Sequence, residues 1–208
     1  MKAFLDNKKD AAREIAKKYN VRMSAEAINL LADLLQQVHF RHRTFILEAG
    51  DVSRDMLYIV RGLARQYYNK EGDETDHVVD VVREGYMLVC SESLFSGKPS
   101  RLNVHTLEPT YAYGMNYKDF KKLASENKEI CTLLSAIMEA VVLQKDEMCN
   151  ILDGTPIDKY LALMAKDAEI IRRTSLRYIA SYLRMAPETL SRVRFKVHNR
   201  EGNEDALV

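Results

Sequence analysis

Three patterns of hydrophobic and polar positions follow one another along this chain, and each predicts a different kind of structure. Near the N-terminus, Ile28, Leu31, Leu35 and Val38 recur at the three- and four-residue spacing of one helix face. Ser24 precedes them and is a residue type that caps helix N-termini well. We therefore predict a helix that begins after Ser24 and packs through this stripe.

Between about residues 45 and 115 the pattern changes to short runs rich in β-branched and aromatic residues. Glycines at positions 50, 62, 72, 85 and 97 separate these runs at intervals of about 10 to 13 residues, a spacing typical of turns in antiparallel sheets. This texture predicts a small antiparallel β-roll. Its strands are expected in FILEA, MLYIVRG, LARQYYN, HVVDVV, RLNVHTL and TYAYGM.

Helical periodicity returns over residues 118–152, where apolar positions alternate between three- and four-residue steps as in a two-stranded coiled-coil seam. One polar residue, Gln144, falls within the seam, where it can fix the register of two helices. We predict that this helix pairs with a second copy of the chain. The alternative is that the stripe packs on the chain's own β-roll. The seam comprises Ile130, Leu134, Ile137, Val141, Gln144, Met148 and Ile151.

The stretch from Thr174 to Lys196 has the pattern of two short helices joined by a tight turn. Ser175 can cap the first helix, and Pro187 suits the first turn of the second. Each helix has an inward apolar face, so the pair can pack as a helix-turn-helix, the motif that places its second helix in the DNA major groove. The inward residues are Ile179, Tyr182 and Leu183 in the first helix and Leu190 and Val193 in the second.

The outward face of the second helix carries side chains that suit a DNA major groove. Arginine can donate two hydrogen bonds to guanine, and glutamate can accept one from cytosine. The residues expected to contact bases are Glu188, Thr189, Ser191 and Arg192. Those expected to contact phosphates are Ser175, Arg177, Arg184, Arg194 and Lys196. Arg184 stands in the turn, where a left-handed backbone would cost a non-glycine residue about 1 kcal/mol.

Positive charge is concentrated in this part of the chain. From Arg172 to Arg200 there are eight Lys or Arg residues and one acid, Glu188, whereas the formal net charge of the 208-residue chain is only +1. Binding to the phosphate backbone requires such a segregated positive surface. We infer that this region binds double-stranded DNA; the alternative is that the basic residues merely solvate the end of a helical bundle.

Between the long helix and the helix-turn-helix, Asp153-Gly154-Thr155-Pro156 must end one helix, and Thr155 can cap the next with Pro156 at its first position. The predicted fold class is therefore α+β, with a jelly-roll-like β-roll, a long dimerisation helix and a C-terminal helical domain. The expected parts are an effector-sensing roll with N-terminal helices at 1–117, a dimerisation helix at 118–152, a hinge at 153–156 and a helix-turn-helix domain at 157–208.

Composition narrows the function further. The chain has no apolar run near the ~20 residues of a membrane span and no secretory signal, so we expect a cytoplasmic protein that does not bind membranes. Its three cysteines, Cys90, Cys131 and Cys149, lack metal-ligand spacing, and we expect no metal site. The sequence contains no GxSxG, HExxH or phosphate-binding glycine loop, so we do not expect an enzyme.

Several segments resemble the CRP/FNR family of bacterial transcription regulators, and the resemblance covers nearly the whole chain. They are ILEAGD, LYIVRG and SLFSGKPSRLNVHTLE in the roll, and IASYL followed by PETLSR in the helix-turn-helix. The resemblance implies a homodimeric regulator on a palindromic site, with RNA polymerase as a candidate partner. It also implies that Glu188 and Arg192 read G·C pairs, and that an effector bound between the roll and the long helix resets the hinge.

The effector region departs from the family members that bind cyclic nucleotides, in which a Gly-Glu pair holds the ribose and an Arg-Ser pair the phosphate. Here Cys90 and Ser91 stand near the expected Gly-Glu, with Glu92 displaced. Leu102 follows Arg101 where the hydroxyl residue would stand. We therefore expect an effector other than cyclic AMP, and no iron-sulfur cluster, since no cysteine precedes Cys90. The expected pocket residues are Glu92, Arg101, Gln144 and Lys145.

The sequence is also compatible with other functions. An orphan regulator that binds DNA constitutively would need no effector. A small-molecule-binding module would use its helix-turn-helix for protein contacts and would not bind DNA. Haem sensing is also open, although no histidine or methionine stands out as an axial ligand.

Overall fold

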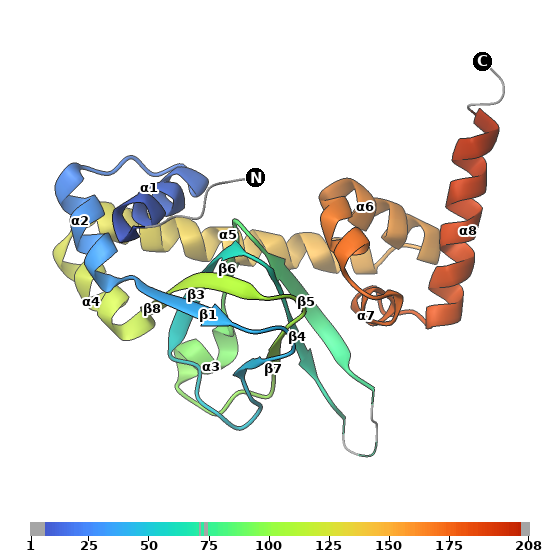
Figure 1. The fold of residues 1–208 in the computed structure, drawn as a ribbon, viewed down its shortest axis with the longest axis horizontal. Coiled ribbons are helices and arrows are strands. Elements are labelled where there is room, and N and C mark those ends of the chain that lie inside the picture. The colour runs from blue at the N-terminus through green and yellow to red at the C-terminus, as the bar shows by residue number, and fades with distance from the viewer. Residues whose placement is uncertain (1–6, 71, 73–74, 205–208) are drawn as a thin grey trace. The chain divides into compact units, whose positions relative to one another are not determined.

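The computed structural model describes residues 7–70, 72 and 75–204, with side chains through residue 199, and forms two compact units (Figure 1). One comprises the chain up to residue 66 together with 82–143, and the other comprises 67–81 together with the chain from 144 onwards. The domain ranges expected from the sequence remain a prediction, and residues 1–6, 71, 73–74 and 205–208 of those ranges lie outside the described residues. Among the described residues, no helix combines the length and apolar character needed to cross a membrane.

The predicted β-roll is confirmed as two four-stranded sheets with the strand orders β1-β8-β3-β6 and β2-β7-β4-β5. Apolar side chains such as Ile59, Val104 and Ala112 form a buried core within the roll. The strands are β1 Gln36–Phe40, β2 Phe45–Leu47, β3 Asp55–Arg61, β4 Leu63–Tyr68, β5 His77–Arg83, β6 Met87–Leu88, β7 Asn103–Thr106 and β8 Thr110–Asn116, with helix α3 Ser91–Ser96 after β6. The α+β fold class predicted from the sequence is therefore confirmed.

Gly62 makes the turn between β3 and β4 possible. Its φ of +110° lies in the region that favours glycine. A Cβ atom at this position would lie 2.6 Å from the Thr110 hydroxyl oxygen and 2.7 Å from the Pro109 carbonyl oxygen. The close backbone approach that brings β3 and β4 beside the start of β8 therefore requires glycine.

A second core forms where helices pack beside the roll within the first unit. Ile15, Leu31, Phe120 and Ile137 are all fully buried there. The helices are α1 Lys8–Lys18, α2 Ala25–Leu34, α4 Tyr117–Glu126 and α5 Lys128–Leu152, of which residues up to 143 belong to this unit.

Two helix predictions need correction. Ser24 caps α2 as predicted, but α2 ends at Leu34, and Val38 belongs to strand β1. The helical stretch predicted over 118–152 is divided at Asn127, whose side-chain oxygen accepts from the Glu129 and Ile130 amides at 2.9 and 3.1 Å. Asn127 therefore caps the start of α5 and divides a segment that hydrophobic periodicity alone predicts to be one continuous helix.

The predicted dimer seam on α5 also needs correction. Ile130, Ile137 and Val141 lie in the core of their own chain, which leaves them no surface for a partner helix. For these three residues the alternative stated from the sequence holds, because the chain's own roll and helices cover the stripe. Met148 and Ile151 are buried as well, whereas Leu134 and Gln144 are partly exposed.

The second unit contains α6 Pro156–Arg173, α7 Leu176–Tyr182 and α8 Pro187–Glu204 (Figure 1). Thr155 caps α6, accepting from the Asp158 amide while the Asp158 carboxylate accepts from the Thr155 amide. A tight turn separates α7 from α8, and Arg184 within it has the predicted left-handed backbone, with φ +52°. Both helices bury the faces predicted from the sequence. The second unit therefore contains the expected helix-turn-helix.

The far end of the β4–β5 hairpin belongs to this unit and is attached to α7 through Ser181. The Ser181 hydroxyl accepts from the Val78 amide at 2.9 Å and donates to the Asp76 carbonyl at 2.7 Å. One side chain thus satisfies two backbone groups of the hairpin, and residues 105 and 103 positions apart in sequence are held together.

We predict that Ser181→Ala lowers the free energy of unfolding by about 1–2 kcal/mol, because both hairpin backbone groups lose their partner. Urea unfolding measures the loss, and hydrogen exchange locates it as faster exchange in residues 76–82. Ser125→Ala is the matched control, since the Ser125 hydroxyl donates to the Lys122 carbonyl in its own helix. Unchanged exchange of the hairpin in Ser181→Ala would contradict the attachment.

Candidate functional site

Helix α8 has one buried face and one exposed face, and the predicted base-contacting residues lie on the exposed one. Leu190 and Val193 are buried, with 0% and 5% of their surfaces exposed. Glu188, Ser191 and Arg192 are exposed at the spacing of a single helix face. Thr189, the fourth predicted residue, lies beside this face and is half-buried. The structure therefore brings the predicted set together on the outer surface of α8.

The residues predicted to contact phosphates lie around this face in the helix-turn-helix. Ser175 occupies the N-cap position of α7, although its side chain makes no capping hydrogen bond. Arg177 lies in the first turn of α7, and Arg184 lies in the turn between the helices. All five predicted residues, Ser175, Arg177, Arg184, Arg194 and Lys196, are exposed.

A hollow of about 280 Å³ joins α8 to the start of α6. Arg192 and Lys196 line it together with Thr155, which caps α6. Two cations beside a helix N-terminus favour an anion such as a phosphate. The sequence did not predict that Thr155 lies beside Arg192 and Lys196, because no local pattern indicates that the start of α6 lies against α8.

A polar group beneath α7 connects the hairpin to the helices of the second unit. Burial raises the pKa of the Asp80 carboxyl, while the Val81 amide, the charges of Lys145 and Lys166 and the Tyr182 hydroxyl act in the opposite direction. Burial and the neighbouring Asp80 raise the pKa of Tyr182 well above its ordinary value. Tyr182 therefore remains a neutral donor to Asp80 near pH 7, which fixes the position of α7.

The four predicted effector-pocket residues divide between the two units. In the first unit, the Arg101 guanidinium pairs with the Glu92 carboxylate at 3.0 Å. Both side chains are largely exposed, at 80% and 68%, so the pair contributes little to stability. Gln144 and Lys145 belong to the second unit, where the charge of Lys145 acts on Asp80.

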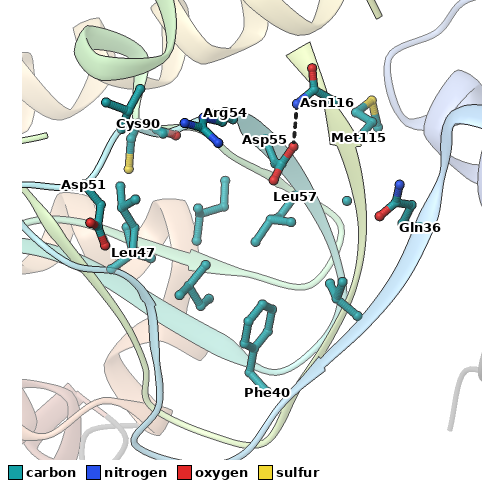
Figure 2. A pocket seen from close by; sticks show the side chains of 17 residues that line it. Gln36, Phe40, Leu47, Asp51, Arg54, Asp55, Leu57, Cys90, Met115 and Asn116 are labelled. Carbon is teal, nitrogen blue, oxygen red and sulfur yellow. Dashed lines mark hydrogen bonds between the residues drawn. The ribbon is translucent and has the colours of Figure 1, made fainter. Parts of the chain in front are cut away.

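A cavity of about 440 Å³ lies within the β-roll, and none of the four predicted pocket residues lines it. Phe40, Leu57 and other apolar side chains line its interior (Figure 2). Asp51, Arg54 and Asp55 are polar residues of the lining, and the Asp55 carboxylate accepts from the Asn116 amide at 3.1 Å. Sequence reasoning missed this cavity, because the same apolar positions predict a filled core equally well.

Within the part of the chain that the structure describes, no group of three or more His, Cys, Asp or Glu side chains is arranged to hold a metal ion. Of the three cysteines, Cys90 is buried and lines the roll cavity, whereas Cys131 and Cys149 are exposed on α5.

Residues 37–127 match the model of the cyclic nucleotide-binding domain. No curated protein matches the sequence.

Solved structures share the fold over most of the chain. FixK2 from Bradyrhizobium japonicum has a TM-score of 0.68 at 17% identity, covering 80% of this chain and 86% of its own. The c-di-GMP-responsive regulator CLP from Xanthomonas campestris has a TM-score of 0.65 at 16% identity, covering 86% and 93%. A transcriptional regulator assigned to the CRP/FNR family from Eubacterium rectale has a TM-score of 0.63 at 13% identity, covering 85% of each chain.

The turn before α8 gives a test of backbone strain. We predict that Arg184→Gly raises the free energy of unfolding by about 0.5–1 kcal/mol, because glycine adopts a positive φ without the steric cost of a Cβ atom. Arg184→Ala is the matched control: it removes the same charge but keeps the Cβ atom, and it should not be stabilised. Equal stabilities of the two variants in urea unfolding would show that the left-handed turn carries no strain.

Proposed function

Residues 37–127 form a cyclic nucleotide-binding domain in a chain with the fold of CRP/FNR transcription regulators, and on this premise we propose that the protein is a sequence-specific, DNA-binding transcription regulator. It acts as a homodimer on a palindromic site, and a small effector other than cyclic AMP controls it. The family is regulatory, and the proposed activity is binding rather than catalysis.

One observation carries the proposal: α8 exposes Glu188, Ser191 and Arg192 on one face while Leu190 and Val193 anchor the opposite face. A recognition helix needs this arrangement, because its base-contacting side chains must project from a rigidly held backbone. The segregated positive charge of the segment adds the attraction to phosphates. Glu188 and Arg192 would read base edges, with Thr189 and Ser191 beside them.

The cations around α8 supply the contacts that set its position on the duplex. Lys196 and Arg192 share the hollow at the start of α6, so a phosphate there would lie close to both cations. Ser175, Arg177 and Arg184 would contact the backbone from α7 and the turn, and Arg194 from α8. Such contacts carry little sequence information, but they orient the helix that reads the bases.

The two copies would meet along the part of α5 that the chain leaves uncovered. Val142 and Leu143 expose 56% and 60% of their surfaces, and two adjacent exposed apolar side chains form a surface that a second copy can cover. Cys131, Ser135, Met138 and Val142 follow one another at steps of four, three and four residues, the spacing of a helix–helix seam. Cys131, Ser135 and Val142 are exposed on this face, whereas Met138 is half-buried and packs partly against the chain's own core.

An effector would bind in the roll. The cavity there has the volume of a small-molecule site, and its lining combines apolar side chains such as Phe40 and Leu57 with polar ones such as Asp51, Arg54 and Asp55. The Arg101 charge is already paired with Glu92, and Leu102 provides no hydroxyl, so the partners of a cyclic phosphate are incomplete. These features favour an effector other than cyclic AMP.

Selection from a random pool of duplex DNA tests the proposal. The purified chain should retain sequences that share a two-fold symmetric motif, with half-sites about one helical turn apart. Adding cyclic AMP should leave both the motif and the yield unchanged. A symmetric motif only in the presence of cyclic AMP would overturn the effector proposal, and retention of no motif under any condition, cell extract included, would favour a binding module that does not read DNA.

Two substitutions on α8 separate base reading from phosphate contact. Arg192→Ala should cost about 1–3 kcal/mol of binding free energy and relax the preference at one position of each half-site. Lys196→Ala should weaken binding to all sequences equally and reduce the slope of log affinity against log salt by about 1. Titrations on specific and scrambled duplexes at several salt concentrations measure both effects. A sequence-selective loss in Lys196→Ala would reverse the assigned roles.

The dimer surface has its own test. Val142→Glu should weaken self-association by about tenfold or more, because pairing the helices would bury two uncompensated carboxylates. Sedimentation equilibrium measures the change. Leu161→Glu is the matched control, since Leu161 is a partly exposed apolar residue on α6, outside the proposed seam. A dimer that is equally stable in both variants would place the contact elsewhere.

A further inference from the structure

Phe195 is an apolar side chain on the face of α8 that otherwise carries polar, base-reading residues. It exposes 69% of its surface, more than any other large hydrophobic side chain in the described part of the chain. An isolated exposed apolar residue is ordinary on a protein surface. Phe195 differs from the nearby apolar residues Val193 and Val197 of α8, which are buried, because it lies on the exposed face of the helix.

Helix geometry aligns Phe195 with the residues proposed to read bases. Glu188, Arg192 and Phe195 are separated by four and three residues, so all three project from the same side of α8. Arg194 and Lys196 flank Phe195 in sequence and, at 100° per residue, project to either side of this stripe. The phenyl ring therefore lies along the centre line of the exposed face, with a cation on each flank.

Only one base presents an apolar group in the major groove. The C5 methyl of thymine is that group, and phenylalanine is among the side chains that contact it. The other base edges carry hydrogen-bond donors and acceptors, which a phenyl ring would desolvate without replacing their partners. An exposed phenyl on a groove-facing helix therefore favours thymine and disfavours a G·C pair at the position it meets.

The distance along the helix fixes where this thymine should lie. Seven residues separate Glu188 from Phe195, which corresponds to about 10 Å along the helix axis. At 3.4 Å per base pair, this reach is about three base pairs. The thymine should therefore fall within about three base pairs of the pair that Glu188 contacts.

We propose that Phe195 is a specificity-determining residue that reads a thymine methyl group in each half-site, an inference that rests on the proposed DNA binding. The flanking cations hold the helix against the two phosphate backbones while the ring packs on the methyl. Neither the sequence motifs nor the family likeness assigns this position a role, because the residues that carry the PETLSR resemblance end at Arg192.

Replacing thymine by uracil, which lacks only the methyl group, tests the proposal. Each thymine of the selected operator is replaced in turn by deoxyuridine, and binding of the full-length protein is measured. At one thymine per half-site the affinity should fall about fourfold, and about 15-fold when both half-sites are substituted, as expected for loss of one buried methyl each. With Phe195→Ala the same substitutions should have no effect.

Two controls make the outcome specific. Phe45→Ala removes another exposed phenylalanine, on β2 in the first unit, and should retain the full response to uracil. Phe195→Leu keeps an apolar side chain and should retain part of it. If the protein binds its operator and no uracil substitution discriminates native protein from Phe195→Ala, this inference is wrong while DNA binding stands. If native protein binds no DNA at all, the proposed function fails first.

Discussion

The burial of one face of α8 is the constraint on which the proposed activity depends. Leu190, Val193 and Val197 are removed from water where α8 packs on α6 and α7. Each such side chain contributes about 1.5–3 kcal/mol when fully buried, so rotating the helix to hide its polar face would expose all three at once. The rotation of α8 about its axis is thereby fixed, and Glu188, Arg192 and Phe195 are held on the outside. The cations around this face can then attract phosphates, because the packing of α8 has already fixed which side of the helix is exposed.

The same unit also holds a strand hairpin against the first helix of the motif. Ser181 and Tyr182 are consecutive residues of α7, and each bonds to the hairpin, one through its hydroxyl to Asp76 and Val78 and the other to the Asp80 carboxylate. Residues 67–81 of this hairpin belong to the same unit as the helix-turn-helix, although β4 begins in the other unit. A polar attachment of this kind can be rearranged at lower cost than an apolar core, because water can replace each lost partner.

The roll itself departs from a nucleotide site in its charges. Arg101, which the resemblance places at the phosphate, pairs with Glu92 on the surface and does not line the cavity of the roll. The roll therefore matches the model of a cyclic nucleotide-binding domain, while the arginine predicted to hold a phosphate lies outside its cavity.

The sequence by itself determined the elements whose signals are local. Alternation and glycine spacing located six of the roll's strands but missed β1 and β6, and Ser175, Pro187 and the inward apolar residues located the helix-turn-helix, including the left-handed Arg184. The sequence also shows the concentration of positive charge and the exposed residues of α8, because residues three and four positions apart lie on the same side of a helix. Only the tertiary structure decided what covers each face. It assigned Ile130, Ile137 and Val141 to the chain's own core, ended α2 before Val38, and placed Thr155 beside Arg192. Periodicity shows that a face is apolar, but the partner that buries it is chosen by contacts between residues far apart in the chain.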